Sequence, residues 1–142
     1  MQIKNILLPV DGSIYSDHSA AYAVYLARLS GAHITAVCCH ELTNYKQDIG
    51  ELLVSELQIK VEKQAAEVLK KTAEIIKENG IEYTCKNISG TPGKVLVSLA
   101  ESKEFDLIVM GSHGHSEILG LHLGSVTLKI LRTIHCPVMV VS

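Results

Sequence analysis

A short apolar run near the C-terminal end of the chain constrains the fold most strongly. Residues 107–110 read Leu-Ile-Val-Met without a polar interruption, and glycine follows at position 111. Such a run is typical of a strand buried on both faces of a parallel sheet. A helical pattern resumes at Ser125, with apolar residues spaced by three and four up to position 134. Gly124 and Ser125 are therefore predicted to open a helix that begins near the end of this strand.

The loop between this strand and this helix has the features of an anion site. Glycines at positions 111, 114 and 124 allow a ligand to approach the backbone closely. The N–H groups in the first turn of a helix lack partners within the helix and attract an anion. The chain contains neither a G-x-G-x-x-G fingerprint nor a Walker P-loop. A phosphate group is therefore predicted to bind here by a different arrangement.

The rest of the chain alternates between strand and helix patterns. Strands are predicted at residues 3–10, 33–39, 81–88, 107–110 and 137–141, and helices from about residue 14 to 30, at 53–79, from the turn at 90–93 to about 103, and at 125–134. Five strands joined by crossover helices predict a three-layer α/β domain, 1–142, with a doubly wound parallel sheet and four helices. Residues 40–50 show no readable pattern.

For two of the predicted helices, the sequence pattern indicates which face is buried. In the first helix the packing face is predicted from small residues, Ala20, Ala21, Val24 and Ala27. In the long helix the apolar positions are Leu53, Leu57, Val61, Ala65, Val68, Leu69, Ala73 and Ile76. The third strand has more polar positions than the others, which is typical of a strand near the edge of a sheet.

Composition excludes several function classes. The hydrophobic content of 47% suffices for a core, and the net charge of −2 offers no basic stripe for nucleic acid or an anionic membrane surface. No signal peptide and no apolar run of roughly 18 residues occur, so we expect a cytoplasmic protein. The cysteines at 38, 39, 85 and 136 are predicted to be buried, reduced thiols.

Four stretches of the chain resemble one protein family. They are the glycine pattern Gly111-x2-Gly114-x9-Gly124-Ser125 and residues 6–13, 106–111 and 136–141. The glycine pattern is similar to the ATP-binding motif of the universal stress protein family, and together the stretches cover nearly the whole chain. This resemblance implies strand order 3-2-1-4-5, which periodicity alone does not give. In that order the winding reverses between the first and fourth strands, whose C-terminal ends open the usual ligand crevice of such sheets.

The resemblance also implies the composition of the site, with ATP, with or without Mg²⁺, as its ligand. The predicted nucleotide-binding residues are Pro9, Val10, Asp11, Cys39, Met110, Gly111, Ser112, His113, Gly114, Gly124, Ser125, Val126 and Thr127. From the residues alone Asp11 could equally cap the first helix, whereas the similar family position contacts the nucleoside. Cys39 falls where the family places a hydrophobic residue beside adenine, with Val37 or Cys38 as alternatives. The hydroxyl and N–H groups of Ser125 and Thr127 would donate to phosphate.

Metal and catalytic sites are not predicted. Seven histidines, among them His113, His115 and His122, suggest a metal centre, but no carboxylate or cysteine accompanies them at a ligand spacing. We expect exposed loop histidines, which could contact phosphate or gate the loop. Phosphoryl transfer requires a metal-holding carboxylate, a group that positions the nucleophile and a cation. Asp11, Lys94 and Lys129 offer such groups, but no pattern brings them together.

Three functions follow from these observations. The first is an ATP-binding universal stress protein that acts as a nucleotide-dependent switch or sensor in the stress response, with at most slow hydrolysis. The second is an ATPase or phosphotransferase with real turnover, and the third is an interaction module with a vestigial site. In the implied order the apolar strand at 137–141 lies at a sheet edge, which predicts a homodimer through pairing of this strand.

Overall fold

Strands and helices alternate along the chain in the computed structural model, which describes residues 1–42, 50–115, 123–132 and 135–142. The elements are β1 (Asn5–Pro9), α1 (Ile14–Ser30), β2 (His33–His40), α2 (Glu51–Glu78), β3 (Tyr83–Ser89), α3 (Pro92–Glu101), β4 (Leu107–Gly111), α4 (Ser125–Arg132) and β5 (Val138–Val141). Among the described residues, no helix has both the length and the apolar character needed to span a membrane.

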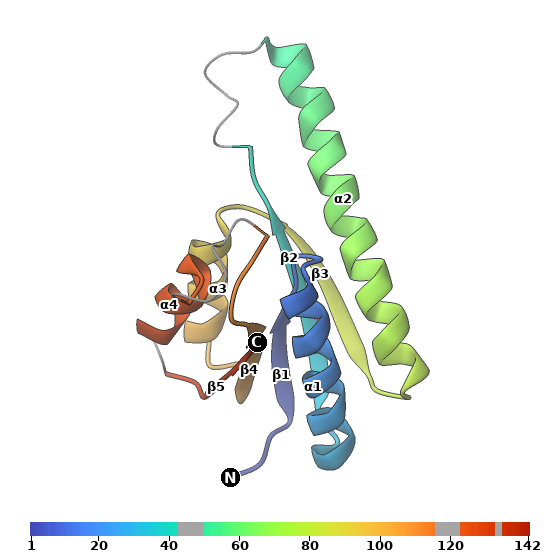
Figure 1. The fold of residues 1–142 in the computed structure, drawn as a ribbon, viewed down its shortest axis with the longest axis vertical. Helices are drawn as coiled ribbons and strands as arrows, with labels where there is room; N and C mark the ends of the chain where they lie inside the picture. Colours follow the sequence, from blue (N-terminus) through green and yellow to red (C-terminus); the bar gives the residue numbers. More distant parts are fainter. Residues whose placement is uncertain (43–49, 116–122, 133–134) are drawn as a thin grey trace.

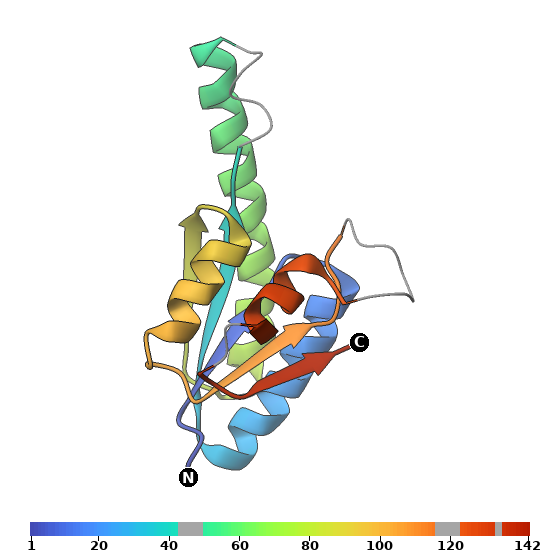
Figure 2. The ribbon, with the colours of Figure 1, turned by 90° about the vertical axis from the view of Figure 1, so that its left-hand side faces the viewer.

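The strands form one parallel sheet in the order β3-β2-β1-β4-β5. Helices α1 and α2 cover one face, and α3 and α4 cover the other (Figure 1). Figure 2 views the sheet from the side of α3 and α4. The predicted three-layer fold and strand order are therefore confirmed.

The core is split by the sheet because successive side chains of a strand point to opposite faces. Along β1, Ile6 and Leu8 join the cluster beneath α1 and α2, whereas Leu7 joins the cluster beneath α3 and α4. The same alternation buries every residue of the run at 107–110, as its apolar character predicts. Strand β3 is exposed along most of its length, as expected for an edge strand.

Helix α1 begins and ends where the sequence predicts, but its buried face differs by one position. The hydroxyl of Ser13 accepts a hydrogen bond from the N–H of Ser16 as the N-cap, and Gly31 ends the helix with a left-handed φ of 75°. Ala20, Val24 and Ala27 are buried as predicted, whereas Ala21 is exposed and Ala23 is buried instead. Position 21 lies about 100° around the helix from Ala20, outside the stripe that faces the sheet.

The prediction for the long helix α2 is right in its length but wrong about burial in its first turns. Ala65, Leu69 and Ile76 are buried, whereas Leu53 remains 45% exposed, and residues 57 and 61 are only half-buried. The reason is spatial, because the first turns of α2 extend beyond the other helices (Figure 1). An apolar helical face needs a covering layer to be buried, and periodicity does not reveal where the sheet ends.

The remaining differences concern element ends. Helix α3 stops at Glu101 because Lys103 adopts a left-handed φ of 62°. Helix α4 is described as far as Arg132, and residue 134 lies outside the described residues. In the stretch 40–50, His40 ends β2 and Gly50 is the N-cap of α2, while residues 43–49 lie outside the description.

Candidate functional site

A cavity of about 310 Å³ opens where the C-terminal ends of β1 and β4 meet. β1 pairs with β2 on one side and with β4 on the other, so the winding of the sheet reverses at this point. The lining residues are Pro9, Val10, Asp11, Ser16, Val37, Cys39, Pro92, Leu96, Met110, Gly111, His113, Gly114, His115, Gly124, Ser125, Val126 and Thr127. The structure thus brings every residue of the predicted set except Ser112 to one cavity.

Ser112 does not line the cavity because it ties the end of β4 to its surroundings. Its N–H donates to the carbonyl of Val141 at 2.7 Å, and its own carbonyl accepts the N–H of Gly124 at 2.8 Å. The residue is buried. Ser112, which was predicted to bind the nucleotide, therefore lies outside the cavity lining and holds the start of α4 against β4.

The first turn of α4 faces the cavity and is fixed to the end of β4. Ser125, Val126 and Thr127 all line the cavity. The hydroxyl of Thr127 donates to the carbonyl of Gly111 at 2.9 Å, so it is engaged within the protein rather than directed at a phosphate as predicted. The start of a helix carries partial positive charge and N–H groups that attract anions. This turn can therefore bind an anion through its backbone.

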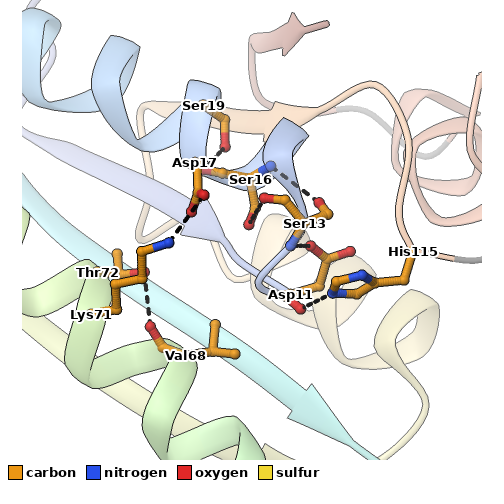
Figure 3. A network of polar contacts seen from close by, with 9 residues as sticks. All are labelled: Asp11, Ser13, Ser16, Asp17, Ser19, Val68, Lys71, Thr72 and His115. Carbon is orange, nitrogen blue, oxygen red and sulfur yellow. Dashed lines mark hydrogen bonds and ion pairs between the residues drawn. The ribbon is translucent and has the colours of Figure 1, made fainter.

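Asp11 stabilises the turn after β1 and leaves the capping of α1 to Ser13 (Figure 3). Its Oδ1 accepts the N–H of Ser13 at 2.9 Å. The Oδ2 atom lies beside Gly114, where an added Cβ would stand 3.0 Å from it. The side chain is exposed. A carboxylate is thus held between the turn after β1 and the glycine loop after β4, and any larger residue at 114 would press on it.

The two loop histidines connect the walls of the cavity. The Nε2 atom of His115 lies 2.6 Å from the carbonyl oxygen of Asp11, and a carbonyl only accepts, so this nitrogen donates (Figure 3). The ring of His113 lies 5.2 Å from that of Tyr15, and its Nδ1 is 2.8 Å from the hydroxyl of Ser112. His115 is exposed as predicted, whereas His113 is half-buried.

Gly111 is required for packing as well as for the loop. A Cβ at this position would lie 2.8 Å from the Cβ of Tyr15 and 3.1 Å from its carbonyl carbon. Because backbone atoms of α1 contribute to this contact, they cannot move aside as a flexible side chain would. The close approach that glycine permits here is therefore to α1.

Cys39 lies in the cavity wall, whereas its neighbour Cys38 belongs to the core on the other face of the sheet. Burial raises the pKa of Cys39 to about 11, and the nearby charge of Glu41 adds to the effect. Burial likewise raises the pKa of Cys38 to about 11. Protonated thiols behave as small hydrophobic groups. Cys38 and Cys136 are buried as predicted, whereas Cys39 is only half-buried and Cys85 is exposed because it lies on the edge strand β3.

Few of the described residues that line the cavity carry a charge. Among the described lining residues, Asp11 is the only one that carries a charge while the histidines are neutral. The candidate cations Lys94 and Lys129 are not among the lining residues. No group of three or more potential metal ligands occurs in the described part of the chain. What the arrangement offers is therefore anion binding and apolar contact.

Three lining residues contributed by other elements were not predicted from the sequence. They are Ser16 from α1 and Pro92 and Leu96 from α3. His115, which was expected to be able to contact phosphate or gate the loop, also lines the cavity. Val37, one of the alternatives to Cys39, lines the cavity as well. Pro92 and Leu96 stand four residues apart on one face of α3, a spacing that indicates a packing face. Their presence at the site depends on how α3 crosses the sheet.

Comparison with known proteins gives matches over nearly the whole chain. The model of the Universal stress protein family matches residues 2–142. Universal stress protein MJ0531 of Methanocaldococcus jannaschii is 33% identical over 141 residues, which cover 97% of this chain and 81% of that protein. Universal stress protein UspA from Lactobacillus plantarum superimposes with a TM-score of 0.90 at 24% identity and covers 100% of this chain and 99% of that chain.

Two further structures of similar fold were solved with ligands. A universal stress protein in complex with cAMP has a TM-score of 0.70 at 23% identity, covering 99% of this chain and 98% of that chain. The universal stress protein from Archaeoglobus fulgidus in complex with dAMP has a TM-score of 0.68 at 22% identity, with 100% of both chains covered.

Proposed function

Because the chain belongs to the universal stress protein family, we propose that it binds an adenine nucleotide, ATP in the first place, in the crevice between β1 and β4 and acts as a nucleotide-dependent switch or sensor in the stress response. The observation that carries this proposal is the cavity at the switch point, where a glycine loop and the first turn of α4 meet an apolar wall. The cAMP and dAMP complexes of two proteins with the same fold support it.

The parts of the nucleotide match the parts of the cavity. The phosphates take the first turn of α4 and the backbone beside Gly111 and Gly114. The ribose lies near the carboxylate of Asp11, an acceptor for its hydroxyl groups. The base lies against the apolar residues of β2 and α3. Asp11 is the only carboxylate among the described lining residues, so a Mg²⁺ ion that accompanied ATP would take most of its ligands from phosphates and water.

The backbone of β2 favours adenine over guanine. The N–H of Val10 donates to the carbonyl of Val37, and the last register pair between β1 and β2 is Pro9 with Val37. Alternate residues of a strand direct their N–H and C=O to the same side, so those of Cys39 point toward the crevice beyond that pair. The amino group of adenine can donate to the C=O of Cys39, and a ring nitrogen of adenine can accept its N–H. Guanine presents an oxygen acceptor and a ring N–H donor at the same positions.

Calorimetric titration with ATP and with GTP tests the proposal. We expect saturable binding of ATP at one site per chain and at least about tenfold weaker binding of GTP, because the reversed base would leave buried polar groups unpaired. Failure to bind any adenine nucleotide at millimolar concentration would contradict the proposed function. An adenine nucleotide ligand also fits the proposed cytoplasmic location.

The protein also forms a homodimer in this proposal, in which β5 pairs with β5 of a second copy of the chain. β5 ends the sheet and carries four apolar residues without a charge, whereas the opposite edge strand β3 carries Lys86 and Asn87. An apolar edge favours strand pairing, and charged residues oppose it. Helix α1 lies beside β5, where His18 bonds the carbonyl of Ser142. It exposes a stripe of apolar residues to solvent, Ile14, Tyr22, Tyr25 and Leu29.

The Val140→Lys variant should convert a dimer to a monomer at micromolar concentration. A charge on the edge strand would have to be desolvated between two paired strands, which costs more than edge pairing gains. Sedimentation velocity measures the change. Cys85→Lys places the same charge on the exposed β3 edge and should leave the dimer intact. A wild-type protein that is monomeric, or a Val140→Lys protein that remains dimeric, would contradict pairing through β5.

A further inference from the structure

Glu41 stands directly after β2 and is fastened to the start of α3. The hydroxyl of Thr91 donates to Oε2 of Glu41 at 2.8 Å. Beside this bond, the N–H of Gly90 donates to the carbonyl of His40 at 2.9 Å. The Glu41 side chain is half-buried. Two contacts therefore hold the end of β2 against the N-terminus of α3, and one of them fixes a carboxylate.

The hydrogen bond to Thr91 places this carboxylate beside the cavity rather than in its lining. Side chains alternate between the two faces of a strand, and both Val37 and Cys39 line the cavity. Glu41 lies two residues beyond Cys39, directly after His40, the last residue of β2. Its partner Thr91 immediately precedes Pro92, which also lines the cavity. Glu41 is not itself among the described lining residues, but its bond to Thr91 holds the carboxylate between the ends of β2 and α3, next to the region that we assign to the base.

Electrostatics agrees with this placement. The charge of Glu41 contributes to the raised pKa of the Cys39 thiol, after the larger effect of burial. The influence of a charge falls with distance and is stronger where burial lowers the effective dielectric constant. The carboxylate is therefore close to a residue of the cavity wall.

Thr91 positions the carboxylate instead of capping α3 with its side chain. Thr91 is the N-cap residue of α3, yet its side chain makes no capping hydrogen bond. A threonine at this position usually accepts an N–H from the first turn. Here its hydroxyl donates to Glu41, and this bond occupies one of about four lone-pair sites of the carboxylate. Acceptor capacity remains for a ligand.

We propose that Glu41 is a specificity-determining residue of the nucleotide site, where its carboxylate accepts a hydrogen bond from the exocyclic amino group of adenine. The inference rests on the proposed function and deepens it. An amino group has two N–H donors, one for the carbonyl of Cys39 and one for Glu41. Thr91 acts as a positioning residue because it holds the carboxylate without contacting the base.

Comparison of ATP with purine riboside triphosphate tests this role, because the two nucleotides differ only in the amino group. Calorimetry gives the ratio of their dissociation constants for each variant. We expect wild-type protein to favour ATP by more than tenfold, and Glu41→Ala to reduce that ratio by about tenfold, the usual loss for a hydrogen bond to a charged group. Thr91→Val should reduce the ratio by a smaller factor, and Thr91→Ser, which keeps the hydroxyl, should restore it.

The outcomes separate this inference from the proposed function. If Glu41→Ala weakens both nucleotides equally and leaves the ratio unchanged, Glu41 only stabilises the junction of β2 and α3, and the inference is wrong while the nucleotide site stands. A wild-type ratio near one leads to the same conclusion. If wild-type protein binds neither nucleotide, the proposed function and the inference both fail. Circular dichroism of each variant establishes that the fold is retained.

Discussion

Valine in place of Gly124 should abolish the stabilisation of the protein by ATP. At a concentration 100 times its dissociation constant, a ligand stabilises the folded state by about 2.7 kcal/mol. For a chain of 142 residues this raises the melting temperature by about 9 °C. Gly124 is buried, lines the cavity and begins the first turn of α4. A branched side chain there would occupy the space that a phosphate needs, so the Gly124→Val protein should show no ATP-dependent shift.

Differential scanning fluorimetry with and without ATP measures this effect. The melting temperature without ATP shows separately what the substitution does to the fold. Gly50→Ala is a suitable control, because an added Cβ at the N-cap of α2 meets no atom within 4 Å and the residue is not at the cavity. This control should keep the full shift. An equal shift in Gly124→Val and wild type would exclude the glycine loop as the phosphate site.

Removal of the Asp11 carboxylate should weaken ATP binding far more than it changes the rate of hydrolysis in the bound complex. The cavity offers backbone N–H groups and a helix start, which bind phosphate equally well before and during reaction. Neither Lys94 nor Lys129 lines it, and no lysine or arginine is found among the described lining residues to stabilise the leaving charge. Turnover should fall well below the roughly 1 to 100 per second of kinases, and bound ATP should persist for minutes or longer with Mg²⁺ present.

Single-turnover assays at measured nucleotide occupancy test this expectation in wild type, Asp11→Ala and Asp11→Asn. The asparagine variant keeps an oxygen for the N–H of Ser13, so it removes the charge while preserving the turn. The alanine variant removes both the charge and the oxygen that accepts the N–H of Ser13. Rapid, repeated and Mg²⁺-dependent release of ADP that disappears in Asp11→Ala at full occupancy would establish an enzyme and reject the switch.

The element pattern of the fold was predictable because burial on both faces of a parallel sheet leaves a clear signal. The unbroken run at 107–110 and the polar third strand were both interpreted correctly. Strand order came only from the family resemblance, since periodicity carries no information on which strands are neighbours. The exposure of Leu53 was not predicted, for a related reason. An apolar helical stripe is the same in sequence whether or not a sheet lies beneath it.

The predicted site residues that the structure brings together are those whose position local sequence determines. The strand end at Gly111 and the helix start at Ser125 follow from apolar patterns and glycine, and both line the cavity. Pro92 and Leu96 were missed because their contribution depends on the packing of α3 across the sheet. Ser112 and the Thr127 hydroxyl were predicted to contact a ligand, whereas the structure engages both of them within the protein. Each is used in a hydrogen bond with a backbone carbonyl or N–H that the sequence does not reveal.

Titration of ¹⁵N-labelled protein with Mg-ATP, followed through the backbone amide signals, tests the central claim most directly, because it reports both binding and its location. We predict saturable changes that are largest at Gly111, Gly114 and Ser125 and at Cys39, the two sides of the cavity assigned to phosphate and base. Amides of β3 and of the first turns of α2 should remain unchanged. Changes that do not saturate, or that centre on residues outside the cavity, would contradict a nucleotide site between β1 and β4.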